Sequence, residues 1–188
     1  MTPLYIGLGV VALIIVYLIL LYNGLVAKRQ QCNEAFAGVD VQLKQRQNLV
    51  PNLVETVKGY ATHEQETLNN VIEARNAAMK ASGPTDSAQA ENVLSASLGK
   101  LFALAESYPD LKANTNFLQL QKELSSIEDK IAAARRFYNS AVGDFNTAVE
   151  QFPASMLASG WGFSQRDFFD LGEEVRADLS VVPEVKFN

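Results

Sequence analysis

The stretch LYIGLGVVALIIVYLILLY, from Leu4 to Tyr22, decides how this chain is organised. It contains no charged residue, whereas the chain that follows is polar, charged and periodic in the manner of helices. At a rise of 1.5 Å per residue, the stretch spans about 28 Å, close to the roughly 30 Å hydrocarbon core of a bilayer. We therefore predict a transmembrane helix over residues 4–23, preceded by a short N-terminal segment, residues 1–3.

The apolar stretch fits an uncleaved anchor better than a cleaved signal peptide or a buried soluble helix. Signal peptides carry a basic n-region, a shorter apolar run and a small-x-small cleavage site. The nearest cleavage candidate here ends at Ala27, but Leu25 is too bulky at its −3 position. Lys28 and Arg29 follow the stretch, and no Lys or Arg precedes it. The positive-inside rule then predicts a single-pass protein with its N-terminus outside and its C-terminal domain in the cytoplasm.

The charge of the chain limits its partners. The net charge is −5, and the excess of acidic residues is largest beyond residue 149. Nucleic-acid binding needs a basic surface, so we predict no nucleic-acid partner. The lone cysteine, Cys32, allows no disulfide within the chain.

Two long apolar stripes organise the soluble part. Apolar residues recur three or four positions apart over residues 115–152, which predicts a long helix of coiled-coil type that Pro153 ends. The same spacing runs over residues 25–78, and no Gly–Pro break separates Tyr22 from the start of that region. We therefore expect the membrane helix to continue into the bundle. Pro51 leaves two possibilities open, a kinked single helix or two helices that meet there.

The remaining segments complete an all-helical protein. Residues 82–87 predict a loop, and a helix of about twenty residues follows and ends at the turn Tyr108-Pro109-Asp110. No stretch shows the two-residue alternation of a strand. We predict an all-α fold in which the N-terminal transmembrane helix continues into an antiparallel four-helix bundle of long helices, residues 24–153.

Beyond Pro153 the composition changes. Residues 154–171 are rich in aromatic side chains, and residues 172–188 are acidic and contain Pro183, which predicts an extended or disordered tail. The aromatic segment is interpreted first as a cap over the open end of the bundle. The functional alternatives are contact with the membrane interface, where Trp is enriched, or contact with a neighbouring subunit. The candidate residues are Met156, Leu157, Trp161, Phe163, Phe168 and Phe169.

Residues that carry chemistry are sparse. His63 is the one histidine, and no Glu-x-x-His pair of the di-iron type accompanies it, so it is expected on the surface of a helix. No Gly-rich phosphate loop or nucleophile elbow is present. We predict no catalytic residue, no metal site and no cofactor. Cys32 falls on the apolar stripe and is expected to be buried, with acylation beside the membrane as the lesser alternative.

Two groups of charged residues allow different interpretations. Asp40 and Lys44 are four residues apart, with Arg46 close to the apolar stripe, and Arg135-Arg136 lie midway along the last long helix. The favoured interpretation is pairing on a solvent-exposed helix face. The alternative is a polar network inside the bundle that fixes helix register at some cost in stability.

Three long runs resemble the LemA family of bacterial membrane proteins. They are VDVQLKQRQNLVPNLVETVKGYATHE at residues 39–64, LAESYPDLKANTNFLQLQKELSSIEDKIAAARRFYNSAVGDFNTAVEQFP at residues 104–153, and GFSQRDFF at residues 162–169. The resemblance implies a transmembrane helix followed by a cytoplasmic four-helix bundle in the bacterial inner membrane. It supplies no enzymatic activity, cofactor or catalytic residue.

We therefore expect a non-catalytic, membrane-anchored scaffold that contacts the lipid bilayer and assembles as a homo-oligomer. The alternative is a monomeric adaptor that binds one membrane-protein partner in quality control or signalling.

Overall fold

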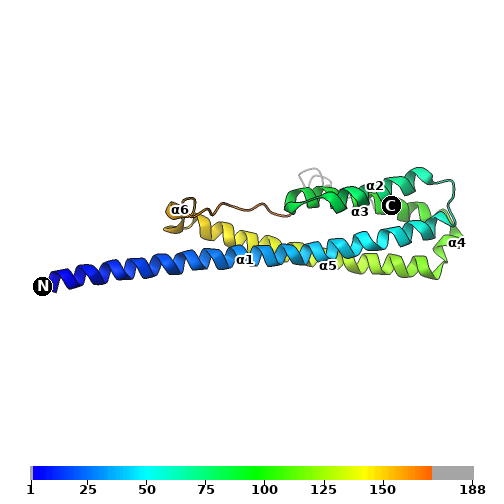
Figure 1. Ribbon diagram of the computed structural model, residues 1–188. Coiled ribbons are helices and arrows are strands. Elements are labelled where there is room, and N and C mark those ends of the chain that lie inside the picture. Colours follow the sequence, from blue (N-terminus) through cyan, green and yellow to red (C-terminus); the bar gives the residue numbers. More distant parts are fainter. Residues whose placement is uncertain (1, 171–188) are drawn as a thin grey trace, which may run out of the picture.

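The computed structural model describes residues 2–170, and within them every regular element is a helix. Figure 1 shows the elements α1 (Thr2–Lys58), α2 (Gln65–Lys80), α3 (Gly83–Ala105), α4 (Pro109–Lys112), α5 (Thr115–Glu150) and α6 (Ala154–Leu157). The predicted all-α fold is confirmed. The predicted tail, residues 172–188, lies outside the described residues.

The bundle has two halves of different construction. Antiparallel α1 and α5 run along its whole length, and the α2–α3 hairpin covers only the half far from the N-terminus, which we call the distal half (Figure 1). In the proximal half, next to the apolar segment, an extended segment takes the place of that hairpin. We call Ala158–Asp170 the C-terminal strap; it begins with turns at residues 158–162 and is extended from Phe163. Each half has its own hydrophobic core, with residues 50–57 of α1 in the distal core and residues 25–43 in the proximal one.

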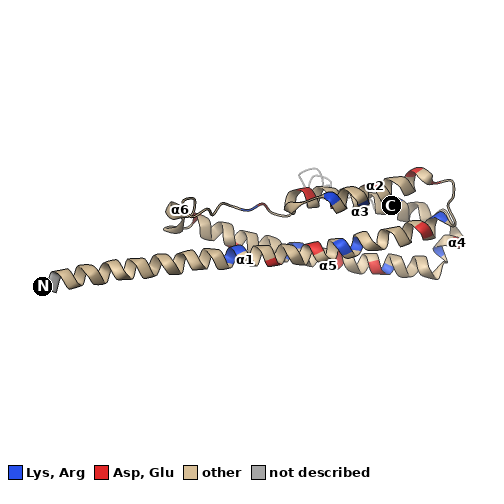
Figure 2. Ribbon diagram, in the orientation of Figure 1, with Lys and Arg blue, Asp and Glu red and all other residues tan. Residues whose placement is uncertain are grey.

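The apolar end of α1 projects beyond the bundle. It is the one helix within residues 2–170 that is long and apolar enough to cross a membrane, and its most apolar window has a mean hydropathy of 2.9. None of that window is buried against protein. Figure 2 shows no charged residue on this projection, while Lys, Arg, Asp and Glu are spread over the bundle. A row of exposed apolar side chains of this size is typical of a lipid-facing surface.

Pro51 lies within α1, which continues as one helix to Lys58. A proline inside a helix lacks the N–H that would bind the carbonyl four residues earlier, here that of Gln47. The side chain of Arg75 on α2 fills this gap, because its Nε donates to the Gln47 carbonyl oxygen at 2.8 Å. At Pro51, α1 is therefore one continuous helix and not two helices that meet there. The neighbouring helix α2 supplies the hydrogen-bond donor that proline lacks.

Two segment boundaries differ from the sequence-based predictions. The first long apolar stripe is interrupted by a turn at residues 59–64, where His63 is exposed and lies outside any helix. Tyr60 is 43% exposed, and Ala61 occupies the core position instead. The predicted loop at residues 82–87 is wrong, because α3 already begins at Gly83. Pro84 fits there since a first-turn N–H has no partner within its own helix.

Arg75→Met should destabilise the bundle by about 1–3 kcal/mol, because it leaves the carbonyl of Gln47 buried without a donor. In a Pro51→Ala background the cost should shrink, since residue 51 then provides its own N–H. Urea denaturation of the full-length protein in detergent micelles, followed by circular dichroism, measures both costs. An equal cost of the Arg75 substitution in the two backgrounds would contradict this account of Pro51.

Candidate functional site

Two asparagines of α5 hold the C-terminal strap by its backbone. Asn146 donates from its side-chain amide to the carbonyl of Arg166 (3.0 Å) and accepts from the N–H of the same residue (2.8 Å). Asn139 makes the same pair of bonds with Phe169, at 3.1 and 2.8 Å. The Tyr138 hydroxyl adds a bond to a strap carbonyl at 2.9 Å. The strap has no secondary structure of its own, and these side chains satisfy backbone groups that would otherwise lack partners.

The spacing of the two asparagines matches an extended chain. Asn139 and Asn146 are two helical turns apart, which is a rise of about 10 Å along α5. Residues 166 and 169 of the strap are three positions apart, and an extended chain also covers about 10 Å over three residues. The strap therefore runs antiparallel to α5 in a fixed register.

Aromatic and guanidinium groups bind the strap side chains to α1 and α5. The guanidinium of Arg29 lies 4.9 Å from the ring centre of Phe163, and that of Arg135 lies 5.1 Å from the ring centre of Phe169. Tyr22 contacts Trp161 and Phe163 edge-on, with centroids 5.5 and 5.6 Å apart. The strap is thus connected to the last residue of the apolar stretch.

The six aromatic-segment candidates separate into three environments. Phe163 and Phe169 are buried, and both belong to the proximal core. Trp161 and Leu157 are half-buried. Met156 and Phe168 are exposed. Their contact with a membrane or a subunit stays a prediction. Trp161 and Phe163 meet at Tyr22, whereas Phe169 lies further along α5.

Sequence reasoning missed the groups that position this segment. Asn139 and Asn146 make four hydrogen bonds to the backbone of Arg166 and Phe169, and the only signal for them was their spacing of seven on one helix face. The apolar stripe predicted over residues 115–152 also runs too far, because its last member, Phe152, lies beyond the end of α5 and is 81% exposed.

A buried polar cluster lies where the two cores meet. Arg46 is 1% exposed and Glu91 is 0% exposed, and their side chains form a direct ion pair. Arg46 also pairs with Glu128 and donates to the Ser95 hydroxyl at 2.8 Å, while the side chain of Gln47 donates to Glu91. Burying these charges costs free energy that the pairing offsets only in part. Of the two interpretations of the charged residues, Arg46 therefore follows the second, a polar network inside the bundle.

The other charged groups are more exposed. Lys44 and Asp40 pair across 2.6 Å on the solvent-exposed side of α1. Arg135 is half-buried between Glu128 and the Phe169 ring, and burial lowers the pKa of its guanidinium. Within residues 2–170 the fully buried charged side chains are therefore Arg46 and its partner Glu91.

Cys32 is fully buried in the proximal core. Its Sγ donates to the carbonyl of Ala141 at 3.2 Å, and burial raises the pKa of the thiol. A raised pKa reduces the reactive thiolate at neutral pH, so the side chain is a poor nucleophile in the folded state.

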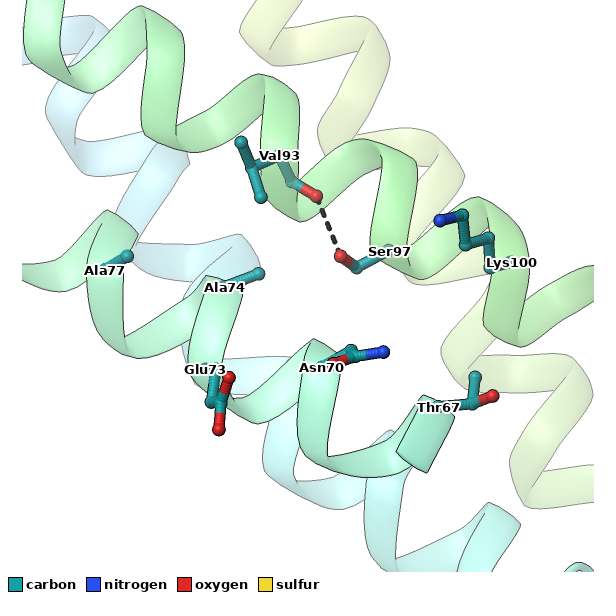
Figure 3. Close-up of a pocket in the computed structure, with 8 residues that line it drawn as sticks. All are labelled: Thr67, Asn70, Glu73, Ala74, Ala77, Val93, Ser97 and Lys100. Carbon is teal, nitrogen blue, oxygen red and sulfur yellow. Dashed lines mark hydrogen bonds between the residues drawn. The ribbon is translucent and has the colours of Figure 1, made fainter. Parts of the chain in front are cut away.

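One hollow of the bundle is lined by side chains of α2 and α3. This cavity has a volume of about 400 Å³. Figure 3 shows that Asn70 and Ala74 of α2 face α3. Its Ser97 hydroxyl donates to the Val93 carbonyl of its own helix. Within residues 2–170, no group of three or more His, Cys, Asp or Glu side chains is arranged to hold a metal ion.

Replacing both strap asparagines, Asn139→Ala with Asn146→Ala, should release the strap. Each substitution leaves strap N–H and carbonyl groups unpaired, at about 1–3 kcal/mol. Trypsin cleavage after Arg166 should accelerate about tenfold or more, because proteolysis follows the population of the opened state. The exposed Asn116 of the same helix provides the matched control, Asn116→Ala. Equal cleavage rates in the control and the double variant would show that the asparagines do not hold the strap.

Comparison with known proteins places the chain in a family. Magnetosome protein MamQ of Magnetospirillum gryphiswaldense is 24% identical over 194 positions, covering 88% of this chain and 71% of that protein. Magnetosome protein MamQ 2 of Paramagnetospirillum magneticum is 26% identical over 201 positions, covering 93% and 73%. Protein LemA of Metamycoplasma hominis is 26% identical over 158 positions, covering 84% and 72%. The family model described as LemA family matches residues 35–187, well over half of the chain, and the protein therefore belongs to the LemA family.

Proposed function

We propose that this protein is a non-catalytic scaffold that holds a stiff helical bundle on the bacterial inner membrane and self-assembles. The observation that carries the proposal is the continuity of α1, which is one helix of 57 residues from the apolar segment to the distal end. Its length is about 85 Å, of which about 54 Å lies beyond Tyr22. Because no linker separates anchor from bundle, the bundle cannot swing freely relative to the membrane.

An exposed face of the α1–α5 pair supports self-assembly. On α5, Ala134, Ala141 and Ala148 recur every seven residues and are half-buried. Phe137 lies beside them and is 68% exposed, turned away from the strap asparagines. Small residues at heptad spacing allow close approach of another helix. Tethering to a membrane raises the effective concentration of copies, so a modest contact is sufficient.

Phe137→Glu should reduce self-association of the full-length protein, since it places a charge on this face. Mass photometry of protein extracted in lipid nanodiscs should show oligomers for the unsubstituted chain and a shift toward monomer for the variant. Val93→Glu on α3, where Val93 is 57% exposed, serves as the control.

A clean monomer for the unsubstituted chain, also uncrosslinked in membranes, would contradict the scaffold. A foreign protein that copurifies in stoichiometric amount with such a monomer would favour the adaptor instead.

We also propose that the bundle faces the cytoplasm, because Lys28 and Arg29 follow the apolar stretch. In a Cys32→Ser background, Lys58→Cys at the exposed distal end of α1 should resist a membrane-impermeant maleimide in intact spheroplasts. It should react after lysis. A Thr2→Cys variant should react in intact spheroplasts. Labelling of position 58 without lysis would reverse the proposed orientation.

A further inference from the structure

The proximal end of the bundle lies at the height where the apolar stretch ends. The contact between Cys32 and Ala141 sets the relative height of α1 and α5. From there, ten residues back along α1 lead to Tyr22, and eleven residues forward along the antiparallel chain lead to Phe152. Each path rises by about 15 Å, so Phe152 and Tyr22 lie at about the same level. Figure 1 shows α6 beside this part of α1.

Protein contacts even reach into the apolar stretch. Leu18 and Leu21 are half-buried, whereas the other side chains from Leu4 to Leu20 are exposed. Leu21 packs against the proximal core, to which the buried Ala154 and Ala158 around α6 belong. The proximal end of the bundle therefore covers one side of the last helical turn of the apolar stretch, from Leu18 to Tyr22.

At this same end two large apolar side chains have no protein cover. Phe152 is 81% exposed and Met156 is 73% exposed, more than any other large apolar side chain of residues 23–170. Trp161 lies at the same end of the bundle, in edge contact with Tyr22 of α1. In water this arrangement leaves apolar surface exposed, whereas at the boundary of a bilayer that surface is buried.

We propose that the turn between α5 and α6, together with α6, forms a foot that enters the lipid interface next to the transmembrane helix. Phe152 and Met156 insert among the headgroups and upper acyl chains of the phospholipids. Trp161 and Tyr22 take the interfacial position that their rings favour. Lys28 and Arg29, within two turns of Tyr22, are placed for lipid phosphates. The partner is the bilayer itself, and the inference rests on the anchor and not on self-assembly.

The foot gives the bundle a second attachment to the membrane. A single transmembrane helix leaves rotation about its own axis free, and tilt is set by neighbouring contacts and interfacial anchors. The foot contacts lipid on one side of α1 only. It therefore fixes which face of the bundle turns toward the membrane and which remains open to partners.

Spin labels at single cysteines test the foot in the full-length protein. In a Cys32→Ser background, Phe152→Cys and Met156→Cys are labelled with a nitroxide and the protein is reconstituted into phosphatidylethanolamine–phosphatidylglycerol vesicles. Power saturation then compares collisions with oxygen, which concentrates in lipid, and with a water-soluble nickel chelate. Leu13→Cys is the reference in the bilayer. Leu118→Cys is the reference in water, an exposed apolar position on α5 about 51 Å further from the membrane than Phe152.

The labels at positions 152 and 156 should shift toward oxygen and away from the nickel chelate, in the direction of position 13. Nickel accessibility equal to that at position 118 would overturn the foot. Protection from both reagents, with spin–spin broadening that disappears on dilution with unlabelled protein, would assign the surface to a second copy and would also overturn it. A monomer in nanodiscs with oxygen-favoured labels would refute self-assembly and leave the foot standing.

Discussion

The bundle depends on the polar contacts of two neighbouring residues of α1, Arg46 and Gln47. Every other long helix sends a polar side chain to them. Arg75 of α2 binds the backbone carbonyl of Gln47, Glu91 of α3 binds both side chains, and Glu128 of α5 binds Arg46. The proline one turn later makes the first of these contacts necessary, because it removes the donor that a regular helix would supply. The irregularity in the anchor helix thereby fixes where α2 docks.

This polar centre favours specificity over stability. Long helices with apolar stripes can slide past one another by a heptad with little change in the apolar surface they bury. Such sliding would move α6 and the strap away from the end of the apolar stretch. Moving Glu91 away from Arg46 would leave the fully desolvated carboxylate of Glu91 without its cation, at a cost of about 3–5 kcal/mol. The cluster lies between the distal and proximal cores. It therefore fixes one register for both halves while contributing little net stability itself.

Sequence periodicity was sufficient for the helices because burial on one helix face repeats every three to four residues. It failed at residues 59–64, where the apolar spacing continues across a turn and Ala61 replaces Tyr60 in the core. It also could not find the strap contacts. Asn139 and Asn146 bind backbone atoms, which are the same in every residue, so the strap sequence carries no mark of its partners. The match becomes visible only in the folded protein, where two turns of α5 span the same distance as three extended residues of the strap.

Helix lengths explain why an extended strap, and not another helix, follows α6. The 36 residues of α5 extend about 54 Å, whereas the 23 residues of α3, the longer helix of the hairpin, extend about 35 Å. About 20 Å of the α1–α5 pair is therefore left without a covering helix. Another helix would need roughly thirteen residues for that distance, whereas an extended chain needs about six. An extended chain buries less surface per unit length, and Phe163 and Phe169 compensate with large rings. The aromatic composition of the strap thus follows from the short hairpin. The exposed Phe152 and Met156, which precede the strap, are not needed to cover the α1–α5 pair.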